Sequence, residues 1–212
     1  MPVPSPEMMV LLASAASIAF MHTLLGPDHY LPFVSIAVAR RWSWRKVLSI
    51  TLLCGCGHIL GSVLLGMFGI WAQAGVGGLV AIEGWRGDLA AWLLFSFGLL
   101  YLAWGIRHAG RHEVHRHSHA HPQWIIFIIF ILGPCEPLIP LLMYPAAKAS
   151  VAGVLLVTGV FGAVTLVTML AAVAVSFYGV RRLHFPGISR YSHAMAGATI
   201  SLCGASILFM GL

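Results

Sequence analysis

The segment Leu25-Gly26-Pro27-Asp28-His29 interrupts a run of mostly apolar residues, and the similar segment Leu132-Gly133-Pro134-Cys135-Glu136 does so again in the second half of the chain. Each segment places an acidic residue close to a Gly-Pro pair, in a run that contains neither Lys nor Arg. Ionisable groups at membrane depth are costly, so they usually mark a path for ions or protons. Their recurrence in two halves favours a transporter built by internal duplication.

The composition around these segments is that of a membrane protein. The chain has 212 residues, of which 59% are hydrophobic and 8% are charged, unlike a soluble globular domain. Apolar stretches long enough to span a bilayer recur, so we predict an all-α integral membrane protein. The six predicted spans lie near residues 8–38, 47–72, 89–106, 124–147, 150–180 and 192–212. No phosphate-binding loop, nucleotide fingerprint or nucleophile–base arrangement is present, so the sequence does not indicate an enzyme.

Basic residues are sorted by loop, which predicts the orientation. Only Arg86 and Lys148 fall in the second and fourth connections. By the positive-inside rule, both termini lie outside and the basic loops face the cytoplasm of a bacterial or archaeal cell. Charge sorted by side in this way does not indicate a nucleic-acid partner. The remaining basic residues, all in the first, third and fifth connections, are Arg40, Arg41, Arg45, Lys46, Arg107, Arg111, Arg116, Arg181, Arg182 and Arg190.

The predicted spans divide into two halves, residues 1–106 and 124–212, joined by a polar linker at 107–123. An odd number of spans in each half forces opposite orientations, so we predict a 3+3 inverted repeat. The second helix of each half carries polar residues at helical spacing. They are Thr51, Cys54, His58 and Ser62 in the first half, and Thr158, Thr165 and Thr168 in the second.

The prolines predict that helices 1 and 4 are broken. Each proline lacks a backbone N–H and frees the carbonyl four residues earlier, so Pro134 frees the carbonyl of Phe130. Within a membrane such a carbonyl needs a partner, and freed carbonyls are a good environment for a cation. The predicted helix breaks involve Gly26, Pro27, Gly133, Pro134, Pro137 and Pro140.

Polar residues converge near the predicted membrane midplane, where they form a candidate metal site. Imidazole suits nickel, cobalt, zinc, copper and iron(II), thiolate adds affinity for softer ions, and a carboxylate offsets the charge of the ion. In an unbroken helix His22 and His29 would lie about 10 Å apart, so the break at Gly26-Pro27 is needed to bring them together. Cys54 precedes His58 by one helical turn, a spacing suited to chelation. The candidate ligands are His22, Asp28, His29, His58, Cys135, Glu136 and Cys54.

Two further hypotheses concern groups in and beside this site. Asp28 and Glu136 could carry protons with no metal involved. The linker is rich in histidine, a composition typical of metal binding, although a solvated polar loop is the plainer alternative. On the cytoplasmic side it would collect ions before export or buffer them after import. Its histidines are His108, His112, His115, His117, His119 and His121.

The segment from His22 to Asp28-His29 resembles the signature of the nickel/cobalt transporter (NiCoT) family, and Gly57-His58-Ile59-Leu60-Gly61-Ser62 is similar to its second motif. The histidine-rich loop resembles that of nickel/cobalt efflux relatives. This resemblance implies a role in metal selection for His22, Asp28, His29 and His58.

The segment Gly133-Pro134-Cys135-Glu136-Pro137 resembles another branch of the same broad superfamily. That branch includes the CcdA and DsbD type of thiol–disulfide carriers and the UreH-like urease-accessory proteins. The electron carriers use one cysteine in each repeat, whereas here Asp28 stands where the second repeat has Cys135. A dithiol of Cys135 with Cys54 or Cys56 keeps the redox hypothesis open.

We therefore expect a secondary transporter of a divalent transition-metal ion, with nickel or cobalt first and zinc, copper or iron as alternatives. The metal ion would be the substrate, and no organic cofactor is expected. The expected partners are the metal ion and the lipid bilayer, with a homo-oligomer or a metallochaperone left open. The alternative functions are a transmembrane thiol–disulfide electron carrier and an anion exporter of related fold.

Overall fold

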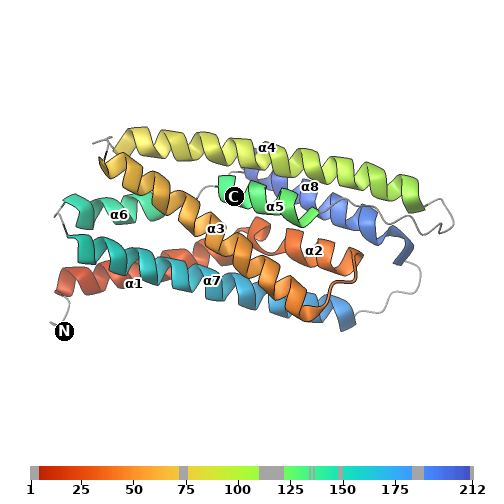
Figure 1. Ribbon diagram of the computed structural model, residues 1–212, viewed down its shortest axis with the longest axis horizontal. Coiled ribbons are helices and arrows are strands. Elements are labelled where there is room, and N and C mark those ends of the chain that lie inside the picture. Colours follow the sequence, from red (N-terminus) through yellow and green to blue (C-terminus); the bar gives the residue numbers. More distant parts are fainter. Residues whose placement is uncertain are drawn as a thin grey trace.

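The computed structural model describes residues 5–71, 76–109, 122–133, 135, 137–147, 150–182 and 189–210, and the regular elements within them are all helical (Figure 1). Long helices run roughly along the longest axis of the molecule (Figure 1). In chain order the elements are α1 (Pro6–Leu25), η1 (Pro27–His29), α2 (Leu31–Ala39), α3 (Trp44–Trp71), α4 (Val76–Ala109), α5 (Pro122–Leu132), α6 (Leu138–Ala147), α7 (Val151–Arg182), η2 (Ser189–Tyr191) and α8 (Ser192–Met210).

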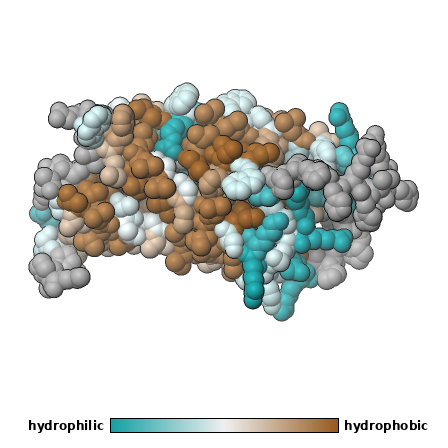
Figure 2. All heavy atoms as spheres, in the orientation of Figure 1, coloured by the Kyte–Doolittle hydropathy of each residue, from teal (hydrophilic) through white to brown (hydrophobic). Residues whose placement is uncertain are grey.

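Five helices of the described chain, α1, α3, α4, α7 and α8, are long and apolar enough to cross a membrane. Their outer faces carry large apolar side chains that are more than half exposed, including Leu60, Leu64, Leu100 and Val167. Figure 2 shows hydrophobic residues covering the middle of the visible surface. A surface of this kind is unfavourable in water and suits lipid, so the fold is that of an all-α membrane protein.

The predicted span 8–38 consists of two helices joined by one tight turn. Helix α1 ends at Leu25, and the N–H of Gly26 donates to the carbonyl of His22 at 3.0 Å. The short η1 follows, and α2 begins at Leu31. The chain thus leaves the helix at the Gly-Pro pair, where Pro27 cannot donate the next helical hydrogen bond.

The predicted span 124–147 is likewise divided, into α5 and α6. Gly133, Cys135 and Pro137 lie between these helices, whereas Pro134 and Glu136 lie outside the described residues. Pro140 lies in the first turn of α6. The N–H groups of a first turn have no partner within the helix, so a proline is tolerated there.

Helix α4 corrects the predicted third span. We predicted a span over 89–106 that begins after the charged residues, whereas α4 starts at Val76. Glu83 lies within this helix with no exposed surface, and it pairs with Arg86. Because the two charges pair, both can be buried in the helix bundle. The predicted span began only after these charges and therefore missed this part of the helix.

Helices α4 and α8 pack backbone to backbone. An ideal Cβ placed on Gly197 would lie 2.5 Å from the Cα atom of Leu102, and one on Gly204 would lie 2.5 Å from the backbone nitrogen of Phe95. Small residues of α8 therefore allow the two helices to pack closely.

Apart from Arg86, the basic residues of the described chain gather at one end of the molecule. The end of α2, the start of α3 and the ends of α4 and α7 all lie there, together with η2 (Figure 1). Hydrophilic residues crowd the same end of the surface in Figure 2. The basic residues at these positions include Arg40, Lys46, Arg107, Arg182 and Arg190.

Candidate metal centre

Three histidines from separate elements meet inside the bundle. His22 lies in the last turn of α1, His29 ends η1, and His58 lies midway along α3. The ring centroids are 4.9 Å apart for His22 and His29 and 5.4 Å apart for His29 and His58. One ring nitrogen from each residue lies within 4.8 Å of the others. Among the described residues this is the group that could hold a metal ion, and the break after α1 is what brings His29 back toward His22.

Gly26 makes this approach possible. A Cβ atom at this position would lie 2.7 Å from Nδ1 of His29 and 2.8 Å from Oδ1 of Asp28. Real Cβ atoms do not come so close to other heavy atoms, so a side chain here would displace one or both groups. The observed positions of His29 and Asp28 therefore require a residue without a side chain at position 26.

Hydrogen bonds orient two of the imidazole rings. Nδ1 of His29 lies 3.1 Å from Oδ1 of Asp28 and 3.2 Å from the carbonyl oxygen of Gly26, and Nδ1 of His58 lies 3.2 Å from the carbonyl oxygen of Phe130. A carbonyl oxygen can only accept, so Nδ1 carries the proton in both rings. The lone pair of each neutral ring then resides on Nε2, as in histidines that ligate metals.

The Nε2 atoms of His22, His29 and His58 are buried and have no hydrogen-bond partner in the described chain. Leaving a buried polar atom unsatisfied costs about 1–3 kcal/mol, and native structures contain few such atoms. Three of them beside one another call for a shared partner. Three imidazole lone pairs suit a late first-row divalent ion and leave an open position for water or an exchanging ligand.

Asp28 supports the site from behind His29. Its side chain is 26% exposed, and its oxygen is not among the ligand atoms that lie within 4.8 Å of one another. A carboxylate bonded to the far nitrogen of a ligating imidazole fixes the ring and makes it a better donor. Asp28 thus places a negative charge next to the site by its hydrogen bond to His29, without being one of the ligands.

The structure does not bring the predicted cysteine ligands to the histidines. Cys54 is buried in the apolar cluster that contains Met169 and Phe177, and Cys135 is buried in another cluster with Ala19 and Leu138. All cysteines, Cys54, Cys56, Cys135 and Cys203, are free thiols.

Of the predicted accessory histidines, His108 is exposed on α4, where its Nδ1 lies 2.9 Å from the carbonyl oxygen of Trp104. Glu136 lies outside the described residues. The same is true of the remaining linker histidines, His112, His115, His117, His119 and His121.

Sequence analysis missed a buried ion pair next to the end of α5. Arg86 donates through Nη1 to Oε1 of Glu83 at 2.9 Å and through Nη2 to the carbonyl oxygen of Ile131 at 2.8 Å. The preceding carbonyl, that of Phe130, accepts from His58. Two consecutive carbonyls at the helix end are thus held by side chains of α4 and α3. The signal in the sequence was an oppositely charged pair three residues apart within a largely apolar stretch.

We expect Arg86→Gln to lower the free energy of unfolding by about 3–5 kcal/mol, because it removes the guanidinium that pairs with the buried carboxylate of Glu83. Combining it with Glu83→Gln should restore much of that loss, since no uncompensated charge then remains. Reversible denaturation of the purified protein in detergent measures both variants. Asp88→Asn, at an exposed position of the same helix, is the control. A single variant as stable as the double variant would contradict the buried pairing.

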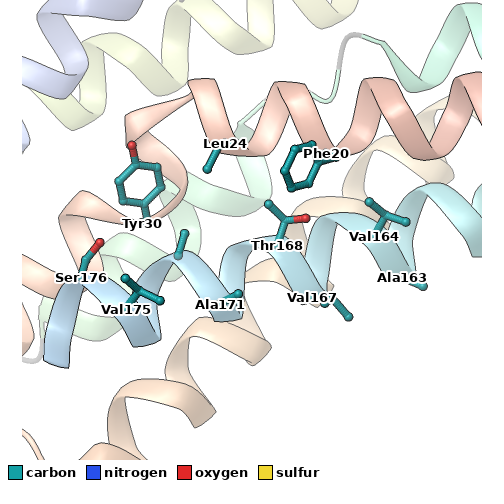
Figure 3. A pocket seen from close by; sticks show the side chains of 11 residues that line it. Phe20, Leu24, Tyr30, Ala163, Val164, Val167, Thr168, Ala171, Val175 and Ser176 are labelled. Atoms are coloured by element: carbon teal, nitrogen blue, oxygen red, sulfur yellow. The ribbon is translucent and has the colours of Figure 1, made fainter. Parts of the chain in front are cut away.

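An open groove lies beside the histidines without including them. It has a volume of about 710 Å³ and runs between α1 and α7. Figure 3 shows Phe20 and Leu24 of α1 and the ring of Tyr30 facing Thr168 and Ala171 of α7. Its lining is mainly apolar, so it suits a hydrocarbon chain better than a cation.

Comparison of the chain with protein-family models, with curated proteins and with solved structures gave no match.

Proposed function

We propose that the protein is a secondary transporter that moves a divalent transition-metal ion, nickel or cobalt first, through the site formed by His22, His29 and His58. The observation that carries the proposal is a group of three histidines whose buried Nε2 atoms have no partner in the described chain, with one ring nitrogen of each residue within 4.8 Å of the others. The motif resemblance to nickel/cobalt transporters favours the same ions. Zinc, copper and iron(II) suit these donors as well.

The charge of the site favours transport over permanent binding. Three neutral imidazoles contribute no charge, and Asp28 contributes one negative charge from behind His29. A divalent ion would keep part of its charge in a low-dielectric setting, which weakens its retention. A transport site must bind well enough to admit an ion and weakly enough to release it.

The proposed architecture is a 3+3 inverted repeat. In it, α1 with α2 forms one crossing and α5 with α6 forms its counterpart, each divided by a break in the helix. Broken helices at the midplane are the usual place for a substrate site in such transporters. The basic end would face the cytoplasm, the termini would lie outside, and the histidine-rich linker would serve as an accessory metal-binding loop.

The thiol–disulfide hypothesis has less support. It requires two cysteines that can approach within a Cα separation of about 7 Å. Cys54 and Cys135 lie in different apolar clusters, and neither contributes to the histidine group.

The test is metal binding to the purified full-length protein with the linker histidines replaced by asparagine. The replaced residues are His108, His112, His115, His117, His119 and His121. We expect one equivalent of Co²⁺ or Ni²⁺ per chain, with imidazole nitrogen in the first shell by X-ray absorption spectroscopy, because the intramembrane site remains. Absence of stoichiometric binding to the folded variant would refute the proposal.

A further inference from the structure

Two hydroxyl side chains flank His58 on α3. Thr51 lies about two turns before it and Ser62 about one turn after it. Both residues are fully buried, and neither hydroxyl has a hydrogen-bond partner among the described residues. Together with the unpartnered Nε2 of His58, they place three unsatisfied polar atoms along one face of one helix.

Hydroxyls in membrane helices normally satisfy themselves by bonding to the carbonyl four residues earlier. In α8, Ser201 donates to the carbonyl of Gly197 and Thr199 to that of Met195, each at 3.0 Å. Thr51 and Ser62 have no such bond. Buried polar atoms that protein does not satisfy are the usual partners of internal water.

The neighbouring helices add hydroxyls of the same kind. Thr23 follows His22 on α1, and Thr165 lies on α7; both are fully buried and have no partner in the described part of the chain. An ideal Cβ on Gly162 would lie 3.4 Å from Cγ2 of Ile59, which places this part of α7 beside α3 next to His58. Unsatisfied hydroxyls therefore lie on three helices, two of which carry the histidines His22 and His58.

The opposite face of α3 is apolar and exposed. Leu53 and Leu60 are 49% and 57% exposed, whereas Thr51 and Ser62 have no exposed surface. The helix thus presents one face to lipid and an inner face that carries three polar atoms without partners, with Cys54 packed among apolar side chains between Thr51 and His58. Apolar packing alone would not require hydroxyls on the inner face.

We propose that the inner face of α3 from Thr51 to Ser62 lines a hydrated path for a divalent cation, with the histidine group part way along it. This inference rests on the proposed function and adds the route by which the ion reaches the site. The segment covers roughly 16 Å at 1.5 Å per residue, about half the thickness of a hydrocarbon core. Beyond Ser62 the route meets Arg86, whose Nη2 would lie 3.2 Å from a Cβ atom on Gly61.

Single cysteines tested with silver ion can detect this path. The background carries alanine in place of Cys54, Cys56, Cys135 and Cys203 and asparagine in place of the six linker histidines, and into it Thr51→Cys or Ser62→Cys is introduced. Leu53→Cys and Leu60→Cys are matched controls on the lipid-facing side. Intact protein in lipid vesicles is exposed to Ag⁺, and the reaction is then quenched. The protein is denatured and alkylated, and the fraction of thiol that Ag⁺ did not block is measured by mass spectrometry.

We expect Ag⁺ to block the thiols of Thr51→Cys and Ser62→Cys roughly tenfold faster or more than those of the two controls, since only a hydrated face admits the ion. Co²⁺ should slow this blocking by competing for the histidine site on the route. The background protein must retain one equivalent of bound Co²⁺.

The two proposals fail in different ways. Blocking of Thr51→Cys and Ser62→Cys no faster than of the leucine positions, with Co²⁺ still bound, would overturn the path and leave the metal site standing. Fast blocking at both positions with no Co²⁺ binding to the full-length protein would support the hydrated path and overturn the proposed metal transport.

Discussion

His29→Ala is expected to weaken Co²⁺ or Ni²⁺ binding at the intramembrane site by well over 100-fold, since even the loss of an outer-shell partner of a ligand costs 10–100-fold. His29 is the central ring of the group: its centroid lies 4.9 Å from that of His22 and 5.4 Å from that of His58. Removing it leaves two imidazoles and also detaches Asp28 from the site. Two neutral ligands cannot offset the dehydration of a divalent ion.

Visible absorption of bound Co²⁺ and calorimetric titration measure this loss in the variant without linker histidines. His193→Ala is the matched control, because His193 is a histidine that also makes a side-chain hydrogen bond, at 2.8 Å to the hydroxyl of Tyr101, but belongs to no ligand group in the described chain. Asp28→Asn should fall between them, about 10–100-fold weaker than the parent. Equal affinities of His29→Ala and His193→Ala would place the metal elsewhere.

Local chemistry in the sequence predicted much of this site. The distance between His22 and His29 in a continuous helix required a break, and the Gly-Pro pair supplied its position. Pro134 removes the usual donor to the carbonyl of Phe130, and the structure shows His58 donating to that carbonyl, which also receives the N–H of Gly133 at 3.2 Å. Rules about backbone donors act within a few residues, so they can be applied to a sequence alone.

The placement of the cysteines could not be predicted in the same way. Cys54 shares a helix face with His58 at a chelating spacing, yet it packs in the cluster that holds Met169 of α7. The surroundings of a short side chain depend on which neighbouring helix packs against it. Residues close by in the sequence do not reveal which helix that is. Glu83 and Arg86 were missed for a related reason, since their burial depends on a carbonyl contributed by a distant segment, that of Ile131.

Gly197→Ala is expected to be among the most destabilising single-methyl changes in the described part of the chain, lowering the free energy of unfolding by about 3 kcal/mol or more. The added Cβ would fall 2.5 Å from the Cα atom of Leu102 and 2.8 Å from the carbonyl carbon of Tyr101. Both are backbone atoms of α4, so no rotamer change can relieve the collision. The helices would have to separate along an interface where Gly204 of α8 also meets backbone, that of Phe95.

Gly159→Ala is the matched control for this prediction. Gly159 lies on the exposed side of α7, and a Cβ atom there would meet no other atom within 4 Å. Alanine is favoured over glycine in a helix by up to about 1 kcal/mol, so this variant should be as stable as the parent or slightly more stable. Reversible denaturation in detergent, followed by circular dichroism, compares the two. Equal stability of the two variants would show that α4 and α8 do not pack backbone to backbone, because helix propensity alone favours alanine at both positions.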